Sequence, residues 1–310
     1  MTSTEFLLLL HSVPHLGEKA LARLLRLATQ QRLLPDSFLS MSATAWQERF
    51  DLHPDACEAL ASDRDALMAR SIELARCLRT YDVQLLSVES ATYPSRLIRN
   101  EDAPPPLLYA RGSLGLLDWN YGSDRFTFTI AVSNGPGTAT MDRLDALASE
   151  LSAAGGVPVT GHDRAPYQRL ALAAQRNNRS TIYVLDRGLR EALGPQFDRP
   201  PFAAARIRDV EFDIDRDLAL SPFRLDDHSI GANNRKRDAI VFGLSDIIIA
   251  LDIRAGGSMV KACSDAAGRN RPVFVADGGR DGNTALLAEG CRPLPDGQSW
   301  LKVVLRSLHN

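Results

Sequence analysis

Residues 126–277 alternate between short runs rich in valine and isoleucine and segments with apolar residues at helical spacing. The apolar runs are FTFTIAVS, GVPVTG, STIYVLD, DIIIALD and PVFVAD, and most of the segments between them are long enough for helices. Apolar strands that alternate with helices are typical of a parallel sheet that is buried on both faces. The pattern therefore predicts an α/β, Rossmann-like fold with helices on both faces of a parallel sheet.

The segments on either side of this core have a different character. Residues 1–82 carry helical patterns without a strand signal, which predicts a small all-helical module. After the apolar run VQLLSV, three consecutive prolines at 104–106 exclude a helix and fix an extended approach to LLYARG. We therefore predict a helical module at 1–82 and an extended Rossmann-like domain at 83–310, with a lead-in at 83–125, the core at 126–277 and C-terminal helices at 278–310.

The overall charge excludes long-range attraction to polyanions. The chain has 36 Lys and Arg against 38 Asp and Glu, a net charge of −2, so any contact with nucleic acid needs a local basic patch. The four cysteines form no C-x-x-C pair, which favours reduced thiols over disulfides or a zinc site. The apolar run near the N-terminus lacks a positive leader and is too short to cross a bilayer, so we expect a cytoplasmic protein without membrane contact.

Ligands of open parallel sheets bind outside the carboxyl ends of the strands. Four such loops follow apolar runs: SNGPGTAT, TGHDRAPY, DRGLRE and DIRAGGSMVKA. In the first, Gly135 and Gly137 match the start of a dinucleotide fingerprint, but Thr140 replaces its third glycine. A tight turn whose amides face a phosphate, or no ligand, is favoured over a nicotinamide site. In the second, His162 and Asp163 form either a local polar turn, which we favour, or an acid/base couple.

The loop RAGGSMVKA combines features of an anion site. Gly256 and Gly257 permit a close turn, Ser258 can cap the following helix, and Lys261 projects from its first turn. Free N–H groups, the positive end of a helix dipole and a cation together attract anions. A plain strand-to-helix turn with a capping serine is the alternative.

The densest cationic cluster is Asn-Asn-Arg-Lys-Arg at 233–237, just before an apolar helix and strand. Such a run is often the solvated face of a helix. Its place before the fourth strand allows Arg235, Lys236 and Arg237 to contact phosphates, with Asn233 and Asn234 bonding sugars or base edges.

Signatures of common enzymes are missing from the sequence. It contains no G-x-S-x-G elbow, no H-E-x-x-H and no P-loop. We therefore expect no catalytic residues, no metal ligands and no cofactor.

With these segments in order, the chain resembles the DNA-processing protein A family (DprA/Smf) over nearly its full length. YPSRLIRNEDAPPPLLYARGSL is similar to the family's lead-in, and FLLLLHSVPHLGEKALARLL to its N-terminal helix-hairpin-helix-like module. IAVSNGPG, VTGHDRAPY, RKRDAIVFGLSDIIIALDIRAGGSMVKA and GNTALLAEGCRPL stand where the family has its remaining motifs. The resemblance implies an extended Rossmann fold, non-enzymatic binding of single-stranded DNA, a homodimer, and delivery of strands to a RecA-type recombinase.

The family's motifs are altered at several positions. Gly135 stands in place of an arginine, Asp238 and Ala239 replace an asparagine and an arginine, and Lys261 replaces a threonine. These departures favour a divergent branch, such as a DprA-like antitoxin that binds a cognate toxin in a toxin–antitoxin or antiviral defence locus. The DNA- or phosphate-binding residues that we predict are Ser133, Asn134, Gly135, Gly161, Arg164, Asn233, Asn234, Arg235, Lys236, Arg237, Gly257, Ser258 and Lys261.

The competing hypothesis is a nucleotide-binding sensor or a nucleotide-hydrolysing enzyme on a related Rossmann core. Phosphoribohydrolases of that kind need a Pro-Gly-Gly-x-Gly-Thr-x-x-Glu loop. The loop AGGSMVKA lacks both the second glycine step and the glutamate, so the acid for N-glycosidic cleavage is absent.

Overall fold

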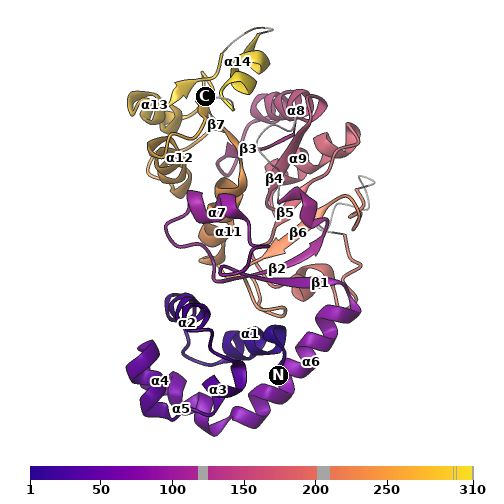
Figure 1. Ribbon diagram of the computed structural model, residues 1–310. Coiled ribbons are helices and arrows are strands. Elements are labelled where there is room, and N and C mark those ends of the chain that lie inside the picture. The colour runs from indigo at the N-terminus through magenta and orange to yellow at the C-terminus, as the bar shows by residue number, and fades with distance from the viewer. Residues whose placement is uncertain (118–124, 201–209, 296, 298, 309–310) are drawn as a thin grey trace.

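A nine-stranded sheet forms the centre of the structure, a computed structural model that describes residues 1–117, 125–200, 210–295, 297 and 299–308 (Figure 1). Its order is β1-β2-β6-β5-β4-β3-β7-β8-β9. The bounds are β1 (Val83–Ser87), β2 (Leu107–Gly112), β3 (Phe126–Val132), β4 (Gly156–Thr160), β5 (Ile182–Val184), β6 (Leu218–Ser221), β7 (Ile247–Asp252), β8 (Val273–Val275) and β9 (Arg292–Pro293). The strands β3 to β9 are parallel, as predicted, whereas β1 and β2 extend the sheet in antiparallel fashion.

Helices cover both faces of the sheet, because the strands are apolar on both sides. In β7, Ile247 and Ile249 join the buried cluster of α8 (Thr138–Ala153), α9 (Ala165–Arg176) and α14 (Trp300–Arg306). Their neighbour Ile248 joins the opposite cluster, with α11 (Asn233–Leu244), α12 (Ser258–Gly268) and α13 (Asp281–Ala288). The remaining elements of this domain are α7 (Ser95–Asn100), η1 (Leu114–Leu116) and α10 (Leu189–Leu193). The predicted α/β, Rossmann-like fold is confirmed.

Three strands of the sheet were not predicted. LLYARG forms β2, LALS forms β6 inside a stretch without a clear pattern, and Arg292–Pro293 form β9 in the segment where only helices were expected. All three runs are short. The strands β2 and β6 form because β6 pairs with β2 on one side and with β5 on the other, and β9 forms because it pairs with β8. Parts of the predicted lead-in and C-terminal segments, residues 118–124 and 309–310, lie outside the described residues.

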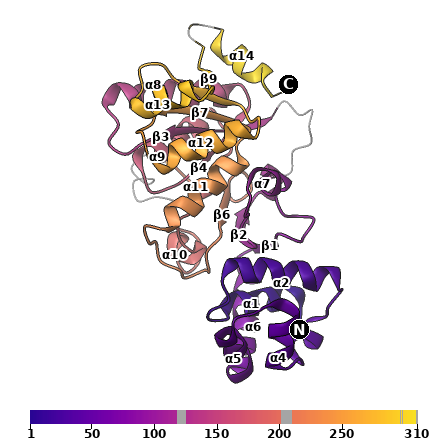
Figure 2. The ribbon, with the colours of Figure 1, turned by 90° about the vertical axis from the view of Figure 1, so that its left-hand side faces the viewer.

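The N-terminal helices pack around a core of their own. The helices are α1 (Ser3–Ser12), α2 (Glu18–Gln30), α3 (Pro35–Leu39), α4 (Ala43–Phe50), α5 (Pro54–Ser62) and α6 (Arg64–Thr80). Phe38, Trp46 and Phe50 make ring contacts at their centre. We call these six helices the helical module; they lie beside the β1–β2 edge of the sheet, and α6 leads into β1 (Figures 1 and 2).

Apolar contacts hold the helical module against the sheet. Leu8 of α1 belongs to a buried cluster that includes Tyr109 of β2, and Leu107 of β2 belongs to the core of the helical module. His11 adds a hydrogen bond of 3.0 Å between its Nδ1 and the Tyr109 hydroxyl. None of the helices in the described part of the chain has the length and apolar character needed to span a membrane.

Candidate nucleic-acid interface

The order in which the chain adds strands to the sheet reverses between the neighbouring parallel strands β3 and β7. From β3 the chain adds β4, β5 and β6 on one side, and it then returns to add β7 and β8 on the other. The loops after β3 and β7 therefore leave the sheet in opposite directions, which is the point where ligands of open α/β sheets bind. Two hydrogen bonds connect these loops: Ser133 N–H to the Asp252 carbonyl (2.9 Å) and Arg254 N–H to Ser133 Oγ (3.0 Å).

Both loops contain a glycine in the left-handed region. Gly135 has φ 70° and Gly256 has φ 68°, a conformation that residues with a side chain rarely adopt. No atom lies within 4 Å of where a Cβ would stand at either position. The helices that follow, α8 and α12, have Gly137 and Gly257 as their N-caps and no side-chain cap, so their first N–H groups face the same edge.

An arginine follows each of the parallel strands β4 to β8. In the order of the strands across the sheet, from β6 through β5 and β4 to β7 and β8, these are Arg224, Arg187, Arg164, Arg254 and Arg280. Only Arg164 was predicted as a site residue. The other four could have been found, because carboxyl ends of parallel strands share one edge and each arginine lies within five residues of a strand end.

Arg280 connects the loops after β3, β7 and β8. Its guanidinium donates to the carbonyls of Asn134 (3.0 Å) and Gly135 (2.6 Å), and it pairs with Asp252 at 3.2 Å. The amide of Asn283 supports this arrangement from below: it donates to three carbonyls at the ends of β7 and β8, and it accepts from Ile253 N–H (2.9 Å). Arg254 is exposed, and its side chain has no ion pair with the described residues.

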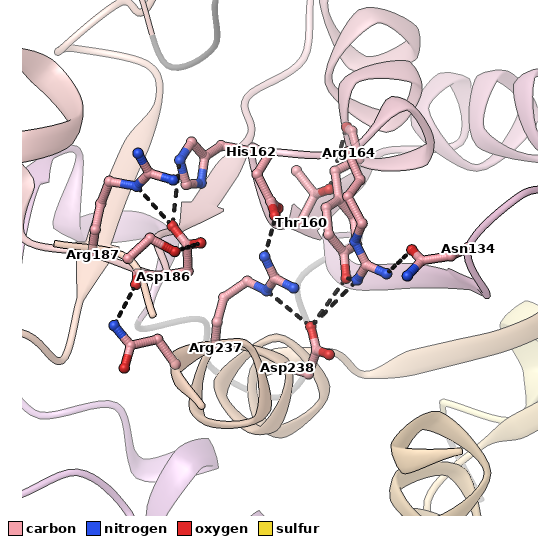
Figure 3. A network of polar contacts seen from close by, with 12 residues as sticks. Asn134, Thr160, His162, Arg164, Asp186, Arg187, Arg237 and Asp238 are labelled. Atoms are coloured by element: carbon pink, nitrogen blue, oxygen red, sulfur yellow. Dashed lines mark hydrogen bonds and ion pairs between the residues drawn. The ribbon is translucent and has the colours of Figure 1, made fainter. Parts of the chain in front are cut away.

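Arg164 reaches the first loop from the other side. It donates to Asn134 Oδ1 (2.9 Å), and its guanidinium lies 4.4 Å from the centre of the Tyr167 ring. The Tyr167 hydroxyl accepts from Arg164 and donates to Asp238 Oδ1 at 3.0 Å. In Figure 3, the ion pairs of Arg164 (3.9 Å) and Arg237 (2.9 Å) meet at Asp238. Asn134 thus lies between Arg164 and Arg280.

Arg237, the last member of the cationic triplet, is buried beneath this edge. Only 1% of its surface is exposed, and it pairs with Asp163 (2.6 Å) and with Asp238 (2.9 Å). Burial acts to lower the pKa of Arg237, but Tyr167 and the two carboxylates outweigh it and raise the pKa. Its guanidinium is inaccessible to a phosphate in this conformation, so Arg237 is a structural residue here rather than part of the interface.

Arg235 and Lys236, the other two residues of the triplet, are not buried with Arg237. Arg235 is exposed. Lys236 pairs with Glu18 of the helical module and lies 5.0 Å from the centre of the Phe223 ring. The helix begins with Asn233, which is buried and donates to the carbonyl of Asp186 (2.8 Å), so it is not available to a sugar or a base. Asn234 is half-buried.

Other predicted residues are placed as follows. Ser258 is the first residue of α12 and does not cap it, since the N-cap is Gly257. Lys261 is exposed and pairs with Asp265 one turn later at 2.9 Å. Gly161 allows a close approach, because a Cβ there would lie 2.7 Å from the Tyr167 ring and 3.1 Å from Arg237 Cδ.

His162 and Asp163 do not face each other as an acid/base couple. Asp163 binds Arg237, whereas His162 Nε2 lies 3.6 Å from Asp186 Oδ1. Burial lowers the pKa of His162 to about 4, although Asp186 opposes this shift. For Asp186, burial acts to raise the pKa, but hydrogen bonds from Arg187 and Ser229 outweigh it and lower the pKa. Among the described residues, no group of three or more His, Cys, Asp or Glu is arranged to hold a metal ion.

We expect the buried neutral state of His162 to make stability depend on pH. The unfolded chain takes up a proton below about 6.5, whereas the folded one stays neutral down to about 4. Stability is therefore lost as the pH falls from 6.5 towards 4, by about 2 kcal/mol at pH 5. In urea unfolding, His162→Asn should shrink the difference between pH 7 and pH 5 by about that amount. His15→Asn, at an exposed histidine without an ion pair to the described residues, should leave the difference unchanged; equal slopes for both variants would refute the assignment.

The arrangement defines a class of protein: an extended Rossmann-type fold with arginines at the carboxyl ends of its strands and a helical module at its N-terminus. Comparison with solved structures identifies two similar proteins. DNA processing protein A of Streptococcus pneumoniae matches with a TM-score of 0.75 and 20% identity, over 97% of this chain and 98% of that one. DNA processing protein A of Helicobacter pylori, whose structure addresses its single-stranded DNA binding mode, matches with a TM-score of 0.56 and 21% identity, over 72% and 96%.

The resemblance predicted from the sequence is thus confirmed for the fold over nearly the whole chain. No family model and no curated protein matches the sequence. Because only about one residue in five is identical, the likeness shows the fold alone. What this chain binds has to be inferred from its own residues.

Proposed function

We propose that this chain is a DNA-binding protein that holds single-stranded DNA along the carboxyl edge of its parallel strands. One observation carries the proposal: at the β3–β7 reversal, Arg164 and Arg280 both contact Asn134, beside the exposed Arg254 and two open glycine turns. The likeness in fold to DNA processing protein A supports it.

The chemistry of this edge suits a flexible polyanion. Guanidinium groups bind phosphate oxygens through two N–H donors at once, and backbone amides at helix starts add donors without charge. A single strand can bend to follow loops that a rigid duplex cannot. The proposed contacts are therefore Arg164, Arg254, Arg280 and the exposed Arg235, together with the predicted Ser133, Asn134, Gly135, Gly161, Asn234, Lys236, Gly257, Ser258 and Lys261.

The partners and the biological role are part of the same proposal. We infer a non-enzymatic protein that acts as a homodimer, either beside a RecA-type recombinase in DNA recombination or as an antitoxin with a cognate toxin in antiviral defence. A small toxin-like gene next to the coding sequence would favour the second role.

Fluorescence anisotropy with a labelled oligonucleotide tests the binding activity. The full chain should bind a 20-nucleotide single strand more tightly than the corresponding duplex, with an affinity that falls as salt is added. No binding of the single strand at 50 mM salt and 100 µM protein would refute the proposed function.

A further inference from the structure

The Glu18 carboxylate of the helical module pairs with Lys236, next to the carboxyl ends of the parallel strands. Glu18 is the first residue of α2, and it pairs with Lys236 in the first turns of α11. Both side chains are partly exposed, at 43% for Glu18 and 33% for Lys236. Lys236 therefore lies at the surface, where a phosphate could approach it, but its charge already has a partner from another part of the chain.

The positive charge around this pair exceeds what Glu18 neutralises. Arg224 and Lys236 both act on His11 and help to lower its pKa to about 3, after burial as the main cause. Arg235 precedes Lys236 and is exposed. The end of the sheet edge marked by Arg224 thus meets the helical module where Arg224, Arg235 and Lys236 lie near Glu18. A second carboxylate, that of Asp227, lies there too and accepts from Arg224 N–H (3.0 Å).

The Glu18 carboxylate is not needed to dock the helical module. The buried contacts of Leu8 and Leu107 and the bond between His11 and Tyr109 hold the module in place, and a partly exposed ion pair adds little to them. Lys236 also keeps a second contact, with the Phe223 ring, so its ammonium group stays near its present position when Glu18 is neutralised.

We propose that Glu18 acts as a built-in competitor for DNA phosphate at Lys236 and closes this end of the interface. The inference rests on the proposed function and names a regulation of the same site. A phosphate that binds Lys236 must displace the Glu18 carboxylate, so the helical module lowers the affinity for DNA and shortens the bound strand. A contact that draws Glu18 away would open the end of the edge.

Glu18→Gln tests this inference because it removes the charge and keeps the shape. In anisotropy titrations at 50 mM salt, the variant should bind a 20-nucleotide single strand about three- to tenfold more tightly than the wild type. Its salt dependence should be steeper by about 0.7, the value for one added phosphate contact on a single strand. Glu58→Gln, at an exposed glutamate of α5 without an ion pair to the described residues, should bind like the wild type.

The double variant separates competition from a change in the fold. Lys236→Ala should cancel most of the gain when combined with Glu18→Gln, and thermal unfolding should show that all variants remain folded. Wild-type affinity in a folded Glu18→Gln variant, or a gain that persists without Lys236, would overturn the inference while leaving the proposed function intact. Absence of binding by the wild type and by every variant would instead overturn the proposed function, and the inference with it.

Discussion

Replacing Arg254 and Arg280 together by alanine is expected to weaken binding of a single-stranded oligonucleotide by about 100-fold or more. Arg254 is exposed at the β3–β7 reversal, and Arg280 holds the Asn134 and Gly135 carbonyls of the first loop. A hydrogen bond to a charged group contributes about 1.5–3 kcal/mol, which corresponds to roughly tenfold or more per contact. Anisotropy titrations at fixed salt give the ratio of affinities directly.

A control with the same loss of charge separates a local contact from a general effect of charge. Lys302 and Arg306 are exposed on α14, which packs against α8 near its last turn through a bond from Trp300 to Glu150. That end of α8 is opposite the proposed interface. The variant with both residues replaced by alanine should keep its affinity within about threefold. Equal losses in the two double variants would show that the strand ends hold no specific site.

The largest effect on stability is expected at Arg237. Arg237→Ala would leave Asp163 and Asp238 without the guanidinium that pairs with both, and it would remove the contact with the Tyr167 ring at 4.8 Å. Breaking a buried ion pair by removing one partner costs about 3–5 kcal/mol. Urea unfolding at pH 7 should show a loss of that size.

The neighbouring arginine of the triplet provides the matched control. Arg235 is exposed on the same helix, so Arg235→Ala should change the free energy of unfolding by no more than about 0.5 kcal/mol. It should instead weaken DNA binding, because it removes a charge that a phosphate can reach. An Arg237→Ala variant as stable as the wild type would contradict the structural role, and the triplet would then be a single basic surface.

The parallel core could be predicted from the sequence because its signal is local. Apolar runs such as DIIIALD are buried on both faces and bounded by helices, and β7 forms where that run predicts it. The pairing of β2 with β6 could not be predicted in this way, since a run as short as LALS becomes a strand only through its partners.

The sequence analysis located the loops that form the candidate site, but it did not show which of their side chains are exposed and which are buried. Three adjacent cations look alike in a sequence, but helical geometry turns Arg235 outward and Arg237 inward. The carboxylate of Asp238, directly after Arg237, was the available signal that this charge has a partner within the fold. Arg254 and Arg280 were missed because they come from separate loops, and only the order of the strands brings them to one edge.

The salt dependence of binding tests the central claim most directly. Measured between 50 and 300 mM salt, the logarithm of the affinity for a single strand should fall linearly with the logarithm of the salt concentration, by about 0.7 for each phosphate contacted. Replacing Arg164, Arg254 and Arg280 by glutamine should make this slope shallower by about 2, because three such contacts are lost. The same slope in the wild type and in a folded triple variant would contradict the account, since the arginines at the strand ends would then contact no phosphate.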